Sequence, residues 1–140
     1  MSDMKSGTGS CLCGGVRVSV AKLNANVGAC HCGMCRKWSG GPFFAADCGT
    51  DVSFEGEDNL TVYNSSAWAE RGFCKKCGSH VFYRLKASQH YMLSAGLFDD
   101  QSEFVLDHQI FIDKKPDFYN FANETVNMTE AEVFAKFGAS

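Results

Sequence analysis

The sequence predicts a mostly β domain with one short helix at its C-terminus. Short segments rich in branched and aromatic residues recur along the chain, and glycine or charged turns separate them. Its 140 residues, 45% of them hydrophobic, are enough for one continuous core. Residues 1–9 are small and polar, which predicts a disordered N-terminal arm. We therefore expect a single domain over residues 10–140.

The expected strands follow from these segments in chain order. They are Val16–Val20, Phe43–Ala46, Val52–Phe54, Leu60–Tyr63, Val81–Leu85, Tyr91–Ser94 and Gln109–Ile112. The helix is expected after Thr129, because Thr129 and Glu132 have the spacing of a capping box. Val133, Phe134 and Phe137 supply its apolar face, and Gly138 can end it.

Charge and hydropathy exclude several classes of partner. The net charge is -3, the isoelectric point is near 5.7, and the positive residues are scattered, so we expect no nucleic-acid partner. The sequence contains no run of 18 or more apolar residues, the length needed to span a bilayer, and the N-terminus lacks the apolar stretch of a signal peptide. We expect a cytoplasmic protein with no membrane partner; the sequence leaves its oligomeric state open.

Seven of the eight cysteines fall into three short clusters. These are Cys11/Cys13, Cys30/Cys32/Cys35 and Cys74/Cys77. A reducing compartment keeps thiols free and favours metal binding over a disulfide framework. A C-x-C pair also places its two thiols in a poor geometry for a disulfide with each other, whereas it suits one metal ion. We therefore expect zinc, with two ions per chain.

Cys11, Cys13, Cys74 and Cys77, hereafter the four-cysteine cluster, form two thiolate pairs of the kind that closes a structural zinc site. Each pair is followed by glycine, which allows a tight turn with amide hydrogens pointing at the sulfurs. Such a zinc would connect early and late strands, and its binding free energy would be folding free energy of about 10 kcal/mol.

Cys30, Cys32 and Cys35, hereafter the cysteine trio, leave one tetrahedral position without a protein ligand. A zinc held by three ligands can bind water or a substrate thiolate, which makes the trio the expected catalytic site. Alternatively, His31 or Cys48 closes the site. His31 should project away from its neighbours in an extended segment, and a lone cysteine is more often a small buried residue. A dithiol redox centre would need a βαβ context that the sequence lacks.

Three stretches resemble the glutathione-dependent formaldehyde-activating enzymes and their relatives, which include centromere protein V. They are Gly9 to Val16 (GSCLCGGV), Cys30 to Lys37 (CHCGMCRK) with Ser39-Gly40, and Arg71 to Ser79 (RGFCKKCGS). The resemblance covers roughly residues 10 to 115. It implies a β-tent fold of small antiparallel sheets, a structural zinc at the four-cysteine cluster and a catalytic-type zinc at the trio. It also implies carbon–sulfur bond formation and cleavage between glutathione and formaldehyde.

This activity suggests roles for several charged residues. A thiol bound at the trio would lose its proton and attack an aldehyde carbon held nearby. Arg36 and Lys37, directly after the trio, are candidates to hold a carboxylate of the thiol substrate. A solvated charged face is the alternative for both, and the same two interpretations apply to Arg71, Lys75 and Lys76.

The chain departs from the family pattern after residue 113. No tryptophan occurs in Lys114 to Tyr119, and we expect Phe118 or Tyr119 to take its packing role. His80 and His108 are interpreted as structural rather than as proton carriers. The leading hypothesis is a zinc-dependent carbon–sulfur lyase or synthase acting on a glutathione-like thiol and a small aldehyde. The alternative is a non-catalytic, zinc-stabilised binding or chaperone-like module.

Overall fold

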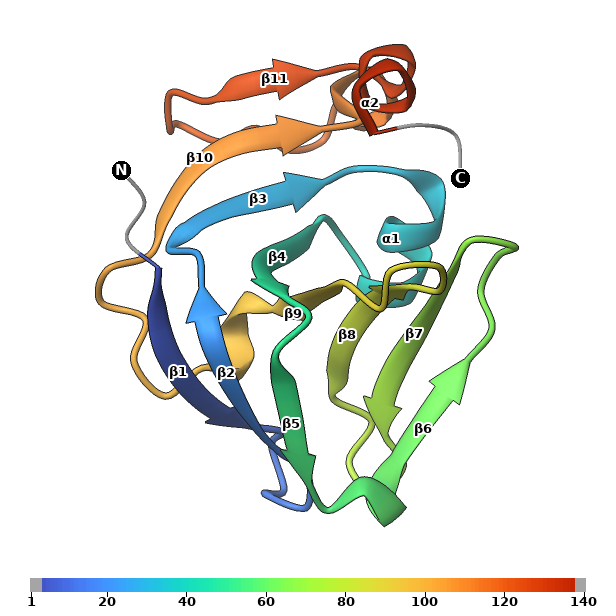
Figure 1. Cartoon of the computed structure of the whole chain (residues 1–140). Helices are drawn as coiled ribbons and strands as arrows, with labels where there is room; N and C mark the ends of the chain where they lie inside the picture. The colour runs from blue at the N-terminus through green and yellow to red at the C-terminus, as the bar shows by residue number, and fades with distance from the viewer. Residues whose placement is uncertain (1–3, 138–140) are drawn as a thin grey trace.

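A computed structural model describes residues 4–137, and most of these residues form two β-sheets (Figure 1). The smaller sheet has the order β1 (Lys5–Ser10), β2 (Arg17–Leu23), β5 (Val52–Glu55). The larger has the order β11 (Val126–Met128), β10 (Val105–Ile110), β3 (Asn26–Cys30), β4 (Phe43–Gly49), β9 (Tyr91–Ser94), β8 (His80–Leu85), β7 (Ala69–Cys74), β6 (Leu60–Tyr63). The helices are α1 (Gly33–Ser39) and α2 (Glu130–Phe137), with short 3-10 turns at Glu57–Asn59, Ala95–Leu97 and Ile112–Lys114. The mostly β class with a short C-terminal helix is confirmed.

Strand β1 corrects the expected disordered arm over residues 1–9. Its backbone pairs antiparallel with β2, and it packs so closely on the 3-10 turn Ala95–Leu97 that a Cβ on Gly9 would lie 2.3 Å from the Leu97 carbonyl oxygen. Glycine allows this close approach, whereas composition alone suggested disorder. Residues 1–3 lie outside the described residues.

The larger sheet is mixed rather than purely antiparallel. Strand β10 pairs parallel with both β3 and β11. In the sequence it comes after β4 to β9, which separate it from its neighbour β3. The remaining neighbours in this sheet pair antiparallel, as expected. Parallel pairing places the C-terminal ends of β3 and β10 side by side, just where the cysteine trio begins (Figure 1).

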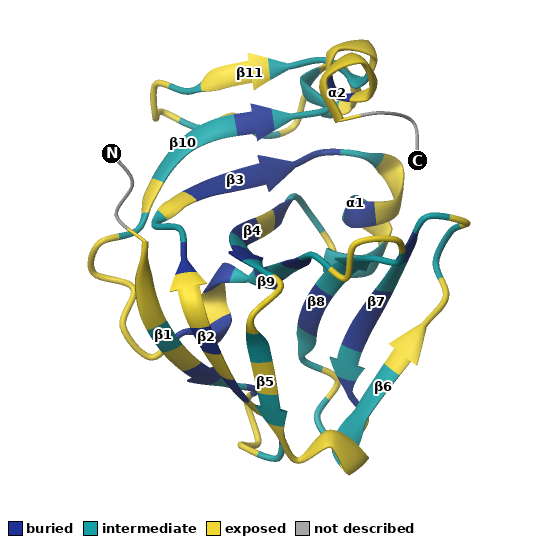
Figure 2. Cartoon of the chain, viewed as in Figure 1, coloured by how far each residue is buried: buried dark blue, intermediate teal, exposed yellow. Residues whose placement is uncertain are grey.

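The main core lies between the two sheets. Strand β2 alternates buried valines with exposed residues, and Val18 and Val20 face Phe82 and Leu93 of the larger sheet in one cluster (Figure 2). Phe82 is fully buried and makes an edge contact with Tyr91, with ring centroids 5.1 Å apart. A second, smaller cluster is built around Cys30, Cys35, Phe43 and Ala45 beneath α1.

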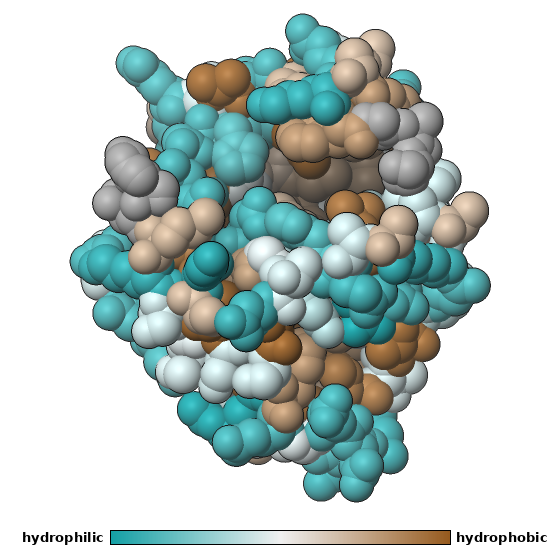
Figure 3. All heavy atoms as spheres, in the orientation of Figure 1, coloured by the Kyte–Doolittle hydropathy of each residue, from teal (hydrophilic) through white to brown (hydrophobic). Residues whose placement is uncertain are grey.

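The capping box of the C-terminal helix is confirmed. The Thr129 amide donates to Glu132 Oε1 at 2.8 Å, and the Glu132 amide donates to Thr129 Oγ1 at 3.2 Å. Val133 is the buried residue of this helix, and Gly138 lies outside the described residues. No helix within residues 4–137 is long and apolar enough to cross a membrane. The face drawn in Figure 3 is mostly hydrophilic, with small hydrophobic patches between the polar side chains.

Candidate metal centre and active site

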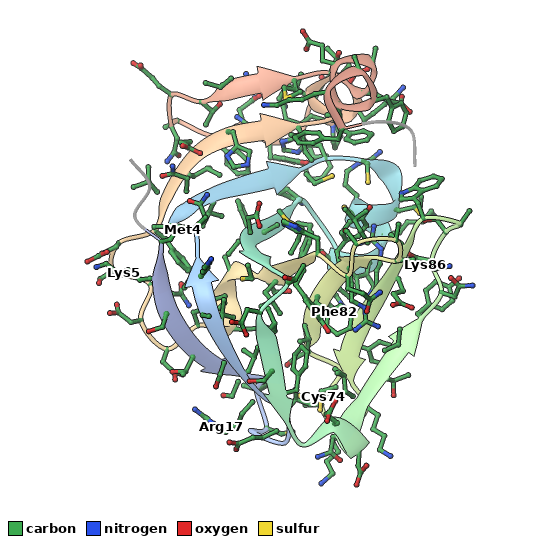
Figure 4. All side chains as sticks on the ribbon, viewed as in Figure 1. Met4, Lys5, Arg17, Cys74, Phe82 and Lys86 are labelled. Carbon is green, nitrogen blue, oxygen red and sulfur yellow. The ribbon has the colours of Figure 1, made fainter. Side chains whose placement is uncertain are left out.

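The four-cysteine cluster joins the turn after β1 to the turn after β7. Cys74 ends β7 at the lower edge of the molecule (Figure 4), where the four Sγ atoms lie within 4.8 Å of one another. The Sγ atoms of Cys11 and Cys13 are 3.7 Å apart, and those of Cys13 and Cys74 are 3.8 Å apart. A tetrahedron with Zn–S bonds of about 2.3 Å has edges of about 3.8 Å. The cluster therefore fits a zinc ion.

Backbone and side-chain donors point at these sulfurs. The amide of Gly15 donates to Cys13 Sγ at 3.4 Å, and that of Val16 donates to Cys11 Sγ at 3.3 Å. Ser79 Oγ lies 3.2 Å from Cys77 Sγ, and this hydrogen bond is the main reason why the pKa of Cys77 falls to about 5. Donors that favour thiolate over thiol prepare the cluster for a cation.

The cysteine trio lies where β3 passes into α1. Cys30 ends the strand, Cys32 caps the helix by accepting the Cys35 amide at 3.3 Å, and Cys35 lies in the first turn. Their Sγ atoms lie within 4.8 Å of one another; Cys30 and Cys35 are buried, and Cys32 is partly exposed. In residues 4–137, no fourth histidine, cysteine, aspartate or glutamate brings a ligand atom into this group. The three sulfurs therefore could hold a metal ion from one side, with Cys32 facing the surface.

Mutual hydrogen bonds concentrate negative charge on the middle cysteine of the trio. Hydrogen bonds from Cys30 and then Cys35 lower the pKa of Cys32 to about 2. Hydrogen bonds from Cys32 and Cys35, together with burial, raise the pKa of Cys30. The Arg71 guanidinium also favours the Cys32 thiolate. Sulfurs that compete for protons in this way are suited to a shared cation.

Neither residue proposed to close the site does so. His31 is fully buried and turned away, with Nδ1 2.7 Å from Tyr119 Oη and Nε2 2.7 Å from Gln109 Oε1. Cys48 donates to the Ala46 carbonyl at 3.3 Å, and burial raises its pKa to about 12. All eight cysteines are free, so the disulfide alternative is wrong.

The charged residues near the trio differ sharply in burial. Arg36 is partly buried, and its Nε donates to the His31 carbonyl at 2.9 Å, which ties it to the loop. Lys37 is exposed, while Lys75 and Lys76 are exposed in the turn of the four-cysteine cluster. Lys75 and Lys76 therefore lie beside the four-cysteine cluster and not beside the trio.

Arg71 on β7 is only 3% exposed, so a solvated charged face is wrong for it. Its Nη2 lies 3.6 Å from Cys35 Sγ, and its guanidinium carbon lies 5.0 Å from the ring centroids of both Trp38 and Tyr83. The sequence signal was an arginine three residues before Cys74 in a strand that leads to a ligand pair. The segment lacks the alternation that predicts a strand, so the sequence alone does not distinguish Arg71 from the exposed cations.

Aromatic residues complete the surroundings of the trio. Trp38 stacks on His80 with ring centroids 4.3 Å apart and meets the edge of Phe43 at 5.5 Å. Burial, and then the charge of Arg71, lower the pKa of His80, which suits a neutral, packed ring. Trp38 therefore covers one side of the Arg71 guanidinium while it packs on the core.

The two residues expected to replace a tryptophan differ in the structure. Tyr119 reaches His31, whereas Phe118 is 81% exposed, so Tyr119 takes the packing role. His108 lies over Gly28 with Nδ1 2.6 Å from Asp107 Oδ1. Gln109 was expected only as part of a strand, yet it holds His31 in place.

Comparisons with known proteins agree with this arrangement. The family model described as glutathione-dependent formaldehyde-activating enzyme matches residues 6–114. An uncharacterized lyase of Schizosaccharomyces pombe is 36% identical over 126 residues, covering 89% of this chain and 92% of that protein. A protein of Halomonas elongata, named as a candidate glutathione-dependent formaldehyde-activating enzyme, is 31% identical over 83 residues, covering 53% of each chain. The crystal structure of a Rhodobacter sphaeroides protein shares the fold, with a TM-score of 0.58, 23% identity, and coverage of 87% of this chain and 99% of that one.

Proposed function

Because this chain belongs to the glutathione-dependent formaldehyde-activating enzyme family, we propose that it is a zinc-dependent carbon–sulfur lyase or synthase. Its substrates would be a glutathione-like thiol and a small aldehyde, and the reaction would make or break their S-hydroxymethyl adduct. The observation that carries the proposal is the trio, which gathers three thiolates without a fourth ligand in the described part of the chain. A site meant only to hold the fold together would be closed, as the four-cysteine cluster is.

In this proposal the four-cysteine cluster holds a structural zinc and the trio holds a second one. When bound at the trio, zinc would lower the pKa of a substrate thiol and keep it as a thiolate at neutral pH. The protein residues supply the rest of the site. Cys32 marks the exposed side of the trio, and Arg36, anchored on the His31 carbonyl, is the candidate for a substrate carboxylate.

Two buried hydrogen bonds hold His31 in place within the loop of the trio. Gln109 accepts a hydrogen bond from His31 Nε2, which leaves Nδ1 to accept one from Tyr119. His31 is thereby fixed between Cys30 and Cys32, and the two thiols are directed to the opposite side of the loop. The many free cysteines fit a reducing compartment, and we propose the cytoplasm.

Cys32→Ser tests the proposal, with Cys48→Ser as its matched control. Zinc per chain is counted by mass spectrometry, and thiol–aldehyde exchange is followed by NMR. We expect wild type and C48S to hold two zinc ions and accelerate exchange. C32S should hold one ion and exchange at the uncatalysed rate. Equal exchange in wild type and C32S refutes the catalytic trio, and a wild type that accelerates no exchange supports the binding-module alternative.

A further inference from the structure

Buried Arg71 and partly buried Arg84, on neighbouring strands of the larger sheet, have similar aromatic surroundings but different hydrogen bonding. Arg84 on β8 lies 4.8 Å from the Phe82 ring centroid and 5.3 Å from that of Tyr91. Its Nε donates to Glu70 at 2.8 Å, Nη1 donates to Tyr91 Oη at 2.7 Å, and Nη2 pairs with Glu70. Every nitrogen of Arg84 is therefore satisfied within the protein.

Arg71 lacks such partners. Nη2 contacts Cys35 Sγ, but Nε and Nη1 are buried and have no hydrogen-bond partner among residues 4–137. Buried polar groups are almost always paired, because water can no longer satisfy them. Two unpaired nitrogens on one buried cation therefore indicate a ligand that the protein itself does not supply.

The position of Arg71 limits what this ligand is. The guanidinium is planar, and Trp38 and Tyr83 hold it in place while Nη2 faces Cys35. Its unpaired N–H groups are thus fixed within a few bond lengths of the trio. The ligand must carry an acceptor atom close to the sulfur that reacts. In a glutathione-like adduct, the acceptor nearest to sulfur is the oxygen on the carbon attached to it, since the peptide carbonyls and the carboxylates lie more bonds away.

We propose that Arg71 is a catalytic residue that donates one of its unpaired N–H groups, on Nε or on Nη1, to the aldehyde-derived oxygen of the substrate. This inference rests on the proposed function. As the thiolate sulfur attacks the carbonyl carbon, a C–S bond forms and the carbonyl π pair moves onto oxygen. That oxygen then takes up the proton lost by the thiol, and the reverse reaction retraces these steps. Arginine keeps its own protons at neutral pH, so Arg71 stabilises the developing charge and does not act as the acid.

A binding experiment tests this contact without turnover. S-acetylglutathione carries a carbonyl oxygen next to sulfur, whereas S-ethylglutathione has nearly the same shape without it. We expect calorimetry on the zinc-loaded wild type to show a preference of about tenfold or more for the acetyl compound, as for a hydrogen bond from a charged donor. Arg71→Lys should lose the preference, and the matched control Arg84→Lys should keep it. A wild type without the preference overturns the inference, whether or not R71K folds.

Kinetics separate this role from carboxylate binding. We expect R71K to lower kcat by about 10²–10³-fold, the typical cost of removing an oxyanion donor, with little change in the KM of the thiol. The loss should persist with 2-mercaptoethanol, which has no carboxylate. A loss confined to glutathione would overturn the inference, and so would equal rates for R71K and R84K at equal zinc content. If the wild type catalyses no exchange, the proposed function fails, and the acetyl preference still decides the role of Arg71.

Discussion

Replacing Cys74 by serine should remove the connection between the first and the later strands. Cys13 and Cys74 are 61 residues apart in sequence, and a metal bound by both closes that loop. Treated as a cross-link, a loop of this length restrains the unfolded chain by about 4 kcal/mol. The entropy of unfolding for 140 residues is about 0.3 kcal/mol per degree, so the unfolding temperature should fall by about 15 °C.

Cys48→Ser is the matched control, because Cys48 is equally buried but lies outside both clusters. Its serine hydroxyl can keep the bond to the Ala46 carbonyl, so we expect a loss of about 1 kcal/mol, or about 3 °C. Thermal unfolding by circular dichroism and zinc per chain are measured for both variants. The reasoning is refuted if C74S keeps two zinc ions and the wild-type unfolding temperature, or if C48S loses as much as C74S.

Two further predictions concern the hydrogen bonds around the clusters. Tyr119→Phe leaves the buried Nδ1 of His31 without a donor, so the free energy of unfolding should fall by about 1–3 kcal/mol; an unchanged denaturation midpoint would contradict the assigned contact. Ser79→Ala should raise the pKa of Cys77 from about 5 toward its usual value of 9.0. Because the pKa of Cys77 is lower in the folded chain than in the unfolded chain, its thiolate stabilises the fold fully above pH 9.0. This stabilisation declines as the pH falls and is lost below about 5. S79A should therefore release zinc at a higher pH than wild type when titrated with a chromogenic chelator, and superimposable release curves would count against this account.

The sequence predicted the strands whose side chains alternate or form apolar runs. Strands β6 and β9 have the predicted bounds, and β4, β5 and β8 contain the predicted segments. Strand β2 begins at Arg17, one residue after the predicted start. Strand β10 ends at Ile110 rather than at the predicted Ile112, because Ile112 begins a 3-10 turn. The structure also groups the cysteines as predicted. The spacing within each short cysteine cluster is a local property of the chain, and the union of Cys11/Cys13 with Cys74/Cys77 follows from the four ligands that a structural zinc requires.

The missed elements depend on tertiary contacts. In β7, buried Arg71 and a glycine interrupt the apolar pattern, and a Cβ on Gly72 would lie 2.4 Å from the Phe82 ring. In β3, Gly28 makes room for His108 in the same way. A residue chosen for close approach to another strand carries no periodic signal of its own.

Helix α1 was missed for a different reason. Its cap is the Cys32 sulfur, where serine, threonine, aspartate or asparagine is usual, and it contains only seven residues before Gly40 ends it with φ of 81°. The cysteine spacing predicts metal ligands at these positions, but it carries no separate signal for the helical turn that positions them.

Strand β7 has a practical consequence for protein engineering. It presents Arg71 to the trio and, three residues later, Cys74 to the four-cysteine cluster, a separation of about 10 Å along one strand. The short loop of the trio therefore cannot be transplanted alone into another scaffold with its electrostatic surroundings intact. A graft must also carry β7, and with it the second metal cluster that anchors the end of the strand.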